Sequence, residues 1–291
     1  MGRPVRRDSS QVKALAGPGR DLGRVLDMPD CTAVPDGVDR SDLVAYCLML
    51  GDDALIMSHR LQQWCTRAPD LEDELALADI ALDLLGQARA LLSRAGDVEA
   101  AGRDEDVLAF HREPDEFRSV VLAEVEDHDF AHLVARLLVF TTWRRAVLAR
   151  LATSREPVLA MVGAKGTVAM HHHCDYAAGW AVRLGDGTDL SHELMRRALE
   201  ATWWWTGELF VPHEVELRVA AAGVGVDPST VRAEVEGVLA RVLTSATLPR
   251  VGHLTSEVTA AAGRHGVHTG AIRDILAELQ GLARAMPGGV W

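Results

Sequence analysis

The sequence contains no asparagine, only two lysines among its 30 basic residues, and no apolar run long enough to span a membrane. Without asparagine the chain cannot carry N-linked glycans, and without about 18 consecutive apolar residues we expect no transmembrane helix. Acidic residues outnumber basic ones by 42 to 30, which gives a formal net charge of −12. Because nucleic-acid binding requires a surplus of Lys and Arg on one face, this balance argues against a nucleic-acid partner.

Cysteine is also scarce, and the cysteines form no recognisable pattern. Cys31, Cys47, Cys65 and Cys174 include no C-x-x-C pair, so we expect neither a zinc site nor a redox-active dithiol. Four unpatterned thiols fit a reducing cytoplasm better than a disulfide-linked secreted protein. The arginines near the N-terminus precede no apolar segment, which argues against a secretory signal. We therefore expect a cytoplasmic protein.

The chain divides into two parts of different composition. Residues 1–40 contain four prolines and five glycines and show no sustained apolar period, so we expect a disordered N-terminal extension. From residue 41 to residue 291 the pattern is helical. Hydrophobic residues make up 48% of the whole sequence, which is enough for this second part to bury a sizeable core.

Apolar residues recur every three or four positions over 41–64 and again over 71–94, which predicts two helices. Ser41 or Asp42 is the expected N-cap of the first helix, because either side chain can accept from a free backbone N–H. The break at 68–70 is short, so the pair is expected to form an antiparallel hairpin. The second helix carries two neighbouring leucine-rich stripes, and we expect other helices to surround it.

A polar, acidic stretch over 96–128 follows, with one short helix expected near 106–111. Two further long helices are predicted over 129–151 and 157–184. Two hairpins joined by one long crossover are the connectivity of the ferritin-like bundle. Three additional helices are expected over 189–210, 227–247 and 269–286. Since no alternating strand pattern appears, the expected fold is all-α, a ferritin-like four-helix bundle with additional C-terminal helices.

A ferritin-like bundle raises the question of a di-iron or di-manganese centre, which needs inward-facing carboxylates and imidazoles. No Glu in the sequence is followed three positions later by His, so the expected Glu-x-x-His signature is missing. Two Asp-x-x-His matches exist, Asp129 with His132 and Asp189 with His192. Both lie at predicted helix starts, where Asp usually serves as a cap or a partner of the helix dipole.

Two histidine groups also invite a metal interpretation. His171, His172 and His173 are consecutive in a predicted helix, so their side chains diverge and cannot bind one ion together. We expect one buried, hydrogen-bonded histidine and two at the rim. His265 and His268 have no acidic neighbour in sequence and are expected to be structural. No nucleophile elbow, Walker A loop or dinucleotide-binding loop is present, and we expect no catalytic residue in this chain.

Two further features have either a structural or a partner-binding explanation. Asp79, Asp83 and Gln87 follow one another at four-residue steps on the second helix, which predicts either a solvated face or a face that pairs with arginines of another protein. Trp203, Trp204 and Trp205 cover about 200° of a helix and cannot all face one core. Either the helix is buried on most sides within its own chain, or a tryptophan anchors a protein interface; a ligand-stacking role is the third alternative.

Specific strings in the sequence resemble the C subunits of phenylacetyl-CoA epoxidase, the multicomponent monooxygenase of aerobic phenylacetate catabolism. The most specific strings are ALDLLGQAR at 81–89 and RLGDGTD at 183–189. The resemblance runs in order from about residue 41 to residue 291. It implies a ferritin-like structural subunit without a cofactor of its own. The implied partners are a catalytic di-iron A subunit, a bridging B subunit and a reductase that holds flavin and an iron–sulfur cluster.

The resemblance also indicates which positions would hold metal ligands. At Leu84 and Gln87 a metal-binding relative would carry the Glu and His of its motif, and Ala169 and Met170 stand where an acid would precede His173. Leu, Ala and Met offer no hard donor atom and Gln is a poor ligand, so no metal is expected. Two alternatives remain. One is a di-iron enzyme with atypical ligands, for instance Asp52, Asp83, His173 and Asp175; the other is a free-standing helical adaptor.

Overall fold

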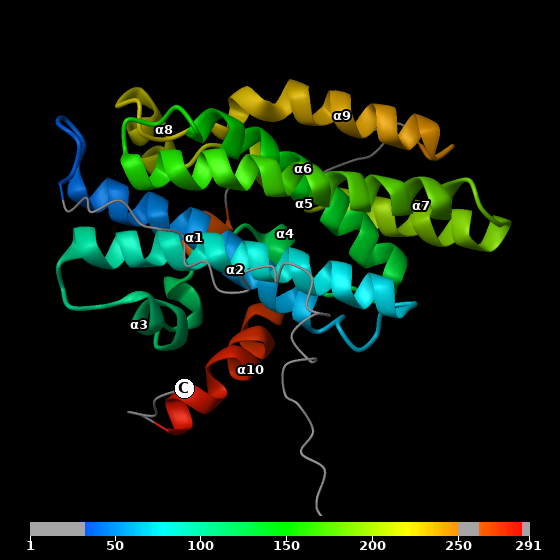
Figure 1. Ribbon diagram of the computed structural model, residues 1–291, viewed down its shortest axis with the longest axis horizontal. Coiled ribbons are helices and arrows are strands. Elements are labelled where there is room, and N and C mark those ends of the chain that lie inside the picture. Colours follow the sequence, from blue (N-terminus) through cyan, green and yellow to red (C-terminus); the bar gives the residue numbers. More distant parts are fainter. Residues whose placement is uncertain (1–32, 250–261, 287–291) are drawn as a thin grey trace, which may run out of the picture.

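The computed structural model describes residues 33–249 and 262–286, and every regular element in these ranges is helical. Figure 1 shows two helical hairpins, α1–α2 and α5–α6, stacked as two layers. The helix α9 lies on the outer side of the second layer, and α10 projects from the first. The all-α, ferritin-like architecture expected from the sequence is confirmed.

The first hairpin consists of α1 (Arg40–Gln62) and α2 (Leu71–Glu99). The N-cap of α1 is Asp39, whose carboxylate accepts from the backbone N–H of Ser41 at 2.8 Å. The prediction that Ser41 or Asp42 caps this helix is therefore wrong. The carboxylate of Asp42 instead accepts two hydrogen bonds from Arg218, each 2.7 Å long.

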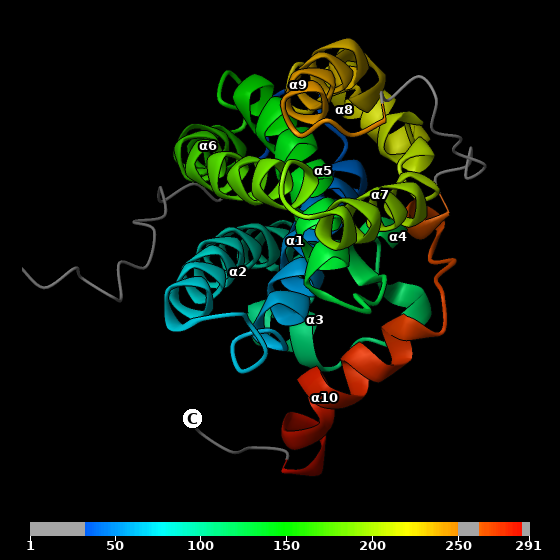
Figure 2. The same cartoon turned by 90° about the vertical axis from the view of Figure 1, so that its right-hand side faces the viewer.

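The second helix is capped by Asp70 and continues beyond the expected end near residue 94. It ends at Ala100, which adopts a left-handed conformation with φ of 56°. Figure 2 shows α2 at the edge of the molecule, where α1, α6 and α3 (Glu105–Phe110) contact it. The expectation that helices surround α2 is wrong, because Leu71, Leu75 and Leu82 remain exposed.

The second hairpin consists of α5 (Phe130–Leu151) and α6 (Pro157–Gly185), close to the predicted bounds. Asp129 caps α5, and Glu156 caps α6 ahead of a proline at the first helical position, where the missing N–H costs nothing. Gly163 permits α6 to approach the end of α5, since a Cβ there would collide with the backbone of Ala152.

The crossover between the hairpins is more ordered and more buried than its polar composition predicts. It contains α3, η2 (Pro114–Glu116) and α4 (Val121–Glu124), and all four residues of α4 are buried. The remaining elements are α7 (Asp189–Trp203), η3 (Gly207–Phe210), α8 (Glu214–Ala221), η4 (Pro228–Val231), α9 (Arg232–Ser245), η6 (Gly263–His265) and α10 (Ala271–Ala285). The predicted helix over 189–210 is thus broken at Trp203, and α8 was not predicted.

The folded body begins before residue 41. Val34 and Val38 pack against the core, and the carbonyl of Ala33 accepts a 2.8 Å hydrogen bond from the buried guanidinium of Arg94. Residues 1–32 of the predicted disordered extension lie outside the described residues. Within the described ranges, no helix is both long enough and apolar enough to cross a membrane.

Candidate metal centre and partner surface

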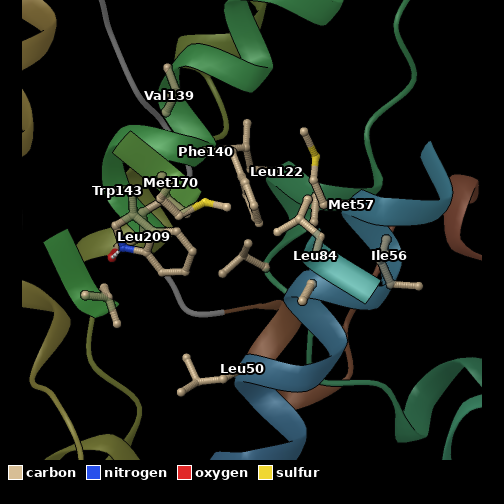
Figure 3. Packing of buried hydrophobic residues seen from close by; sticks show 14 of the residues in the cluster. Leu50, Ile56, Met57, Leu84, Leu122, Val139, Phe140, Trp143, Met170 and Leu209 are labelled. Carbon is tan, nitrogen blue, oxygen red and sulfur yellow. Dashed lines mark hydrogen bonds between the residues drawn. The ribbon is translucent and has the colours of Figure 1, made fainter. Parts of the chain in front are cut away.

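The space between the two hairpins, where a ferritin-like protein would hold its metal ions, is filled with apolar side chains. Leu84 of α2 and Met170 of α6 are both fully buried there. Figure 3 shows them in one cluster with Met57 of α1 and Phe140 of α5. Ala169, beside Met170, is half-buried and ends in a methyl group. These side chains offer only hydrocarbon and the thioethers of Met57 and Met170, so they do not fit a di-iron centre, which needs oxygen and imidazole donors.

Gln87 is buried next to this cluster and is held by an arginine instead of a metal ion. Its amide oxygen accepts a 2.9 Å hydrogen bond from Nε of Arg144, a fully buried residue of α5. Burial lowers the pKa of Arg144 to about 10, although the nearby charge of Asp53 acts to raise it. The carboxylate of Asp53 lies 4.0 Å from Nη1 of Arg144. At neutral pH the guanidinium still carries its charge, and a fixed cation beside Gln87 disfavours a bound metal ion.

The middle of α1 carries two adjacent carboxylates, both fully buried and both bound to arginines. Asp52 accepts from Arg112, including a 3.0 Å bond from Nη1, and from the backbone N–H of Arg118 at 2.8 Å. Asp53 accepts two 2.9 Å bonds from Arg264. These pairs attach the crossover and the segment before α10 to the first hairpin. The sequence offered one signal for them, two consecutive acids inside an otherwise apolar helix stripe.

Two glutamates beside Arg264 were not singled out from the sequence. Burial raises the pKa of Glu208 to about 7, although Arg264 and two backbone N–H groups favour its charged form. Glu216 has its pKa raised by burial as well, and it lies 3.8 Å from Nε of Arg264. Arg264 thus neutralises part of the charge of Asp53, Glu208 and Glu216. All four side chains are buried, so we interpret this cluster as structural.

The ligands of the atypical di-iron alternative do not meet. Nε2 of His173 lies 3.0 Å from a carboxylate oxygen of Asp83, but Asp52 is bound to Arg112 and Asp175 lies on the surface 3.7 Å from His171. Over residues 33–249 and 262–286, no group of three or more His, Cys, Asp or Glu side chains is arranged to hold a metal ion. His173 is buried while His171 and His172 are exposed, as the sequence predicts.

The histidines of the two Asp-x-x-His matches, His132 and His192, have structural contacts. Asp129 accepts from both the backbone N–H and Nδ1 of His132, so it acts as the expected cap. At α7 the cap is Thr188, Asp189 is the first helical residue, and Nδ1 of His192 lies 2.6 Å from the carbonyl oxygen of Gly185. Asp189 therefore occupies the helix-dipole position rather than the cap.

His268 does have an acidic companion, although none is near it in sequence. Its Nδ1 lies 2.8 Å from the fully buried carboxylate of Glu124, and its Nε2 lies 3.0 Å from the carbonyl oxygen of Phe117. Because both partners are acceptors, both ring nitrogens donate, and the imidazole is protonated in this arrangement. Burial opposes the charge, but Glu124 and Phe117 outweigh it and raise the pKa of His268 above its usual value. His265 is exposed and packs against the ring of His213.

The three consecutive tryptophans lie at the end of α7 and have different environments. Trp203 is 6% exposed and belongs to the core of this chain, Trp205 is half-buried against that core, and Trp204 is 40% exposed. Of the three rings, Trp204 is therefore the one placed to contact another protein. Its role in an interface stays a prediction.

The polar stripe on α2 is divided between interior and surface. Gln87 is buried, Asp83 bonds to His173 at the rim with a side chain 53% exposed, and Asp79 is exposed on the outer side. The stripe is therefore not one solvated face. Asp79 and Asp83 alone remain as the predicted partner-binding acids, and they lie beside the exposed leucines of α2.

Two comparisons with known proteins bear on this arrangement. The family model described as phenylacetic acid catabolic protein matches residues 30–291. A relative from Escherichia coli (strain K12), the C subunit of 1,2-phenylacetyl-CoA epoxidase, is 40% identical to the chain over 253 residues. The matched region covers 86% of this chain and 100% of the relative.

Proposed function

The chain belongs to the phenylacetic acid catabolic protein family, and from this membership we propose that it is a non-catalytic structural subunit of a phenylacetyl-CoA 1,2-epoxidase. In this proposal a separate A subunit holds the di-iron centre and the CoA thioester. The present chain stabilises that subunit through protein–protein contacts. It acts in aerobic phenylacetate catabolism in the cytoplasm.

The observation that carries the proposal is the interior of the bundle. The positions that would supply Glu and His ligands hold Leu84, Gln87 and Met170, and the guanidinium of Arg144 bonds to Gln87. A bundle centre filled by apolar packing and a fixed positive charge has no donor set for oxygen activation. The contribution of this chain to an oxygenase then lies on its surface.

The remaining parts of the proposed complex supply the chemistry. A bridging B subunit joins pairs of A and C subunits, and a reductase with flavin and an iron–sulfur cluster delivers electrons to the di-iron centre. This chain contributes no cofactor. Its 40% identity to an epoxidase C subunit over that relative's full length supports the assignment to this position in a complex.

Co-expression with the A subunit tests the proposal. We expect the two chains to co-purify as a stable complex whose iron is bound by the A subunit. This chain purified alone should contain less than about one iron per ten copies. Stoichiometric iron in the isolated chain would support the atypical di-iron enzyme instead. A chain that never associates with the A subunit would behave as a free-standing adaptor, and the proposal would be wrong.

A further inference from the structure

The outer side of α2 carries a line of exposed leucines. The side chains of Leu71, Leu75 and Leu82 are 64%, 60% and 55% exposed, and the half-buried Ala78 lies between them. We call these four residues the leucine seam. Among the described elements, α1, α6 and α3 make the most extensive contacts with α2, and Figure 2 shows α2 at the edge of the molecule. Scattered exposed leucines are ordinary, but a continuous apolar line marks an interaction surface.

The spacing of the leucine seam is that of a helix-packing surface. Positions 71, 75, 78 and 82 are separated by four, three and four residues, which is the repeat that coiled coils use to pack one helix along another. At 1.5 Å per residue the seam is about 17 Å long, or about three helical turns. A helix of similar length on another polypeptide would bury the three leucines together.

The charges beside the leucine seam indicate what kind of helix fits. Glu72, Asp79 and Asp83 are exposed on the neighbouring strip of α2, on the side toward α6, as the contact between Asp83 and His173 shows. A partner with Arg or Lys flanking its apolar residues would meet these acids with opposite charge. A second copy of this chain would instead place acid against acid, which disfavours self-association through the seam.

From this pattern we infer that the leucine seam is the docking surface for a helix of the A subunit that carries an apolar three–four repeat flanked by basic residues. The inference rests on the proposed function, because it takes the A subunit as the occupant. It adds the surface of contact, the secondary structure of the partner segment and the sign of its flanking charge.

Affinity measurements with paired variants test the apolar part. The full chain carrying Leu75→Glu and Leu82→Glu is expected to bind purified A subunit at least about 100-fold more weakly by isothermal titration calorimetry, since each substitution places a carboxylate in a desolvated contact. The matched control carries Leu190→Glu and Leu217→Glu, at leucines 70% and 45% exposed on α7 and α8, and should bind as the wild type does. Both double variants should keep the wild-type melting temperature, because all four leucines are exposed.

Charge reversal tests the electrostatic part. The Glu72→Arg, Asp79→Arg variant is expected to bind about tenfold more weakly at low salt, and the difference should shrink as salt screens the charges. If the wild type binds the A subunit and the seam variants bind equally well, the docking surface is wrong while the proposed function stands. If the wild type does not bind, the proposed function fails and the inference with it. A wild-type homodimer that the seam variants dissolve would identify a second copy as the occupant and overturn the inference.

Discussion

Arg144 and Arg264 are both fully buried arginines, and they differ in what they neutralise. Arg264 donates two 2.9 Å hydrogen bonds to Asp53. Burial alone would lower the pKa of Arg264, but Asp53 and the neighbouring glutamates outweigh it and raise the pKa. Arg144 bonds to a neutral amide and a carbonyl, and its pKa is lowered. A buried charge that loses its partner is costly, whereas a lost neutral hydrogen bond costs less.

This difference predicts unequal effects of removing the two guanidinium groups. We expect Arg264→Met to lower the free energy of unfolding by about 3–5 kcal/mol, because Asp53 is left without its bidentate partner. Arg144→Met should cost less than about 2 kcal/mol, since Asp53 keeps Arg264 and only neutral acceptors lose a donor. Denaturant unfolding measures both, with Arg145→Met at a half-buried neighbour as the control. Equal losses for the two variants would contradict the assignment of Asp53 to Arg264.

His268 predicts how stability depends on pH. Its folded-state pKa is raised above the usual 6.5 by Glu124 and the Phe117 carbonyl, which together outweigh burial. Its stabilising contribution is therefore complete below about pH 6.5 and is lost as pH rises through the folded-state pKa, by about 1.4 kcal/mol for each unit by which the pKa is raised. Unfolding measured between about pH 6 and about pH 9 should show this loss in the wild type. His268→Ala should remove the His268 part of this loss and leave the part below about pH 7 that comes from the raised pKa of Glu208, whereas His172→Ala, at an exposed position, should retain the whole loss.

At the scale of the elements, the order and bounds of the bundle helices could be predicted because each depends on local information. Apolar residues repeat along one helix, and a cap such as Asp129 lies next to the turn that it stabilises. What covers a helix could not be predicted in this way. Periodicity shows that α2 has a second apolar stripe but not what packs on it, and Leu71, Leu75 and Leu82 of that stripe are exposed in the described chain.

The candidate site shows the same division between local and distant information. Comparison with the resembling family identified Leu84 and Gln87 as positions without ligands, from a string only nine residues long. The residue that satisfies Gln87 is Arg144, 57 positions away, and the acid beside His268 is Glu124, 144 positions away. Such pairs are set by the packing of helices against one another, which a single sequence does not encode in its spacing.

The end of α7 separates two roles for neighbouring tryptophans. Trp203→Ala should lower the free energy of unfolding by about 3–5 kcal/mol, because the ring is buried in the core of this chain. Trp204→Ala should change it by less than about 1 kcal/mol but weaken binding to the A subunit about tenfold or more, as expected of an exposed aromatic at an interface. Chemical denaturation of the isolated chain and calorimetric titration with the A subunit distinguish the two effects. If Trp204→Ala destabilises the isolated chain as much as Trp203→Ala does, Trp204 has no interface role.

At the scale of the whole molecule, the described chain contacts its helical body from residue 33 onward. The carbonyl of Ala33 accepts from the buried Arg94, the carbonyl of Asp36 accepts from Arg155 at 3.2 Å, and two valines pack on the core. Residues 1–32 have the composition of a segment without a core of its own. Residues 33–291 carry a formal net charge of −14, because residues 1–32 contain six basic and four acidic residues.

Two truncations test where the folded body begins. Removing residues 1–32 should leave the free energy of unfolding within about 0.5 kcal/mol of the full chain and leave binding to the A subunit unchanged. Removing residues 1–38 should cost about 2 kcal/mol or more, because Arg94, fully buried beside Glu156, loses an acceptor and the apolar contacts of Val34 and Val38 are lost. Unfolding curves of the three chains decide between these outcomes. If removing residues 1–32 already lowers the free energy of unfolding, these residues belong to the folded body and the boundary drawn from composition is wrong. If removing residues 1–38 leaves the free energy of unfolding unchanged, the contacts of residues 33–38 do not stabilise the bundle.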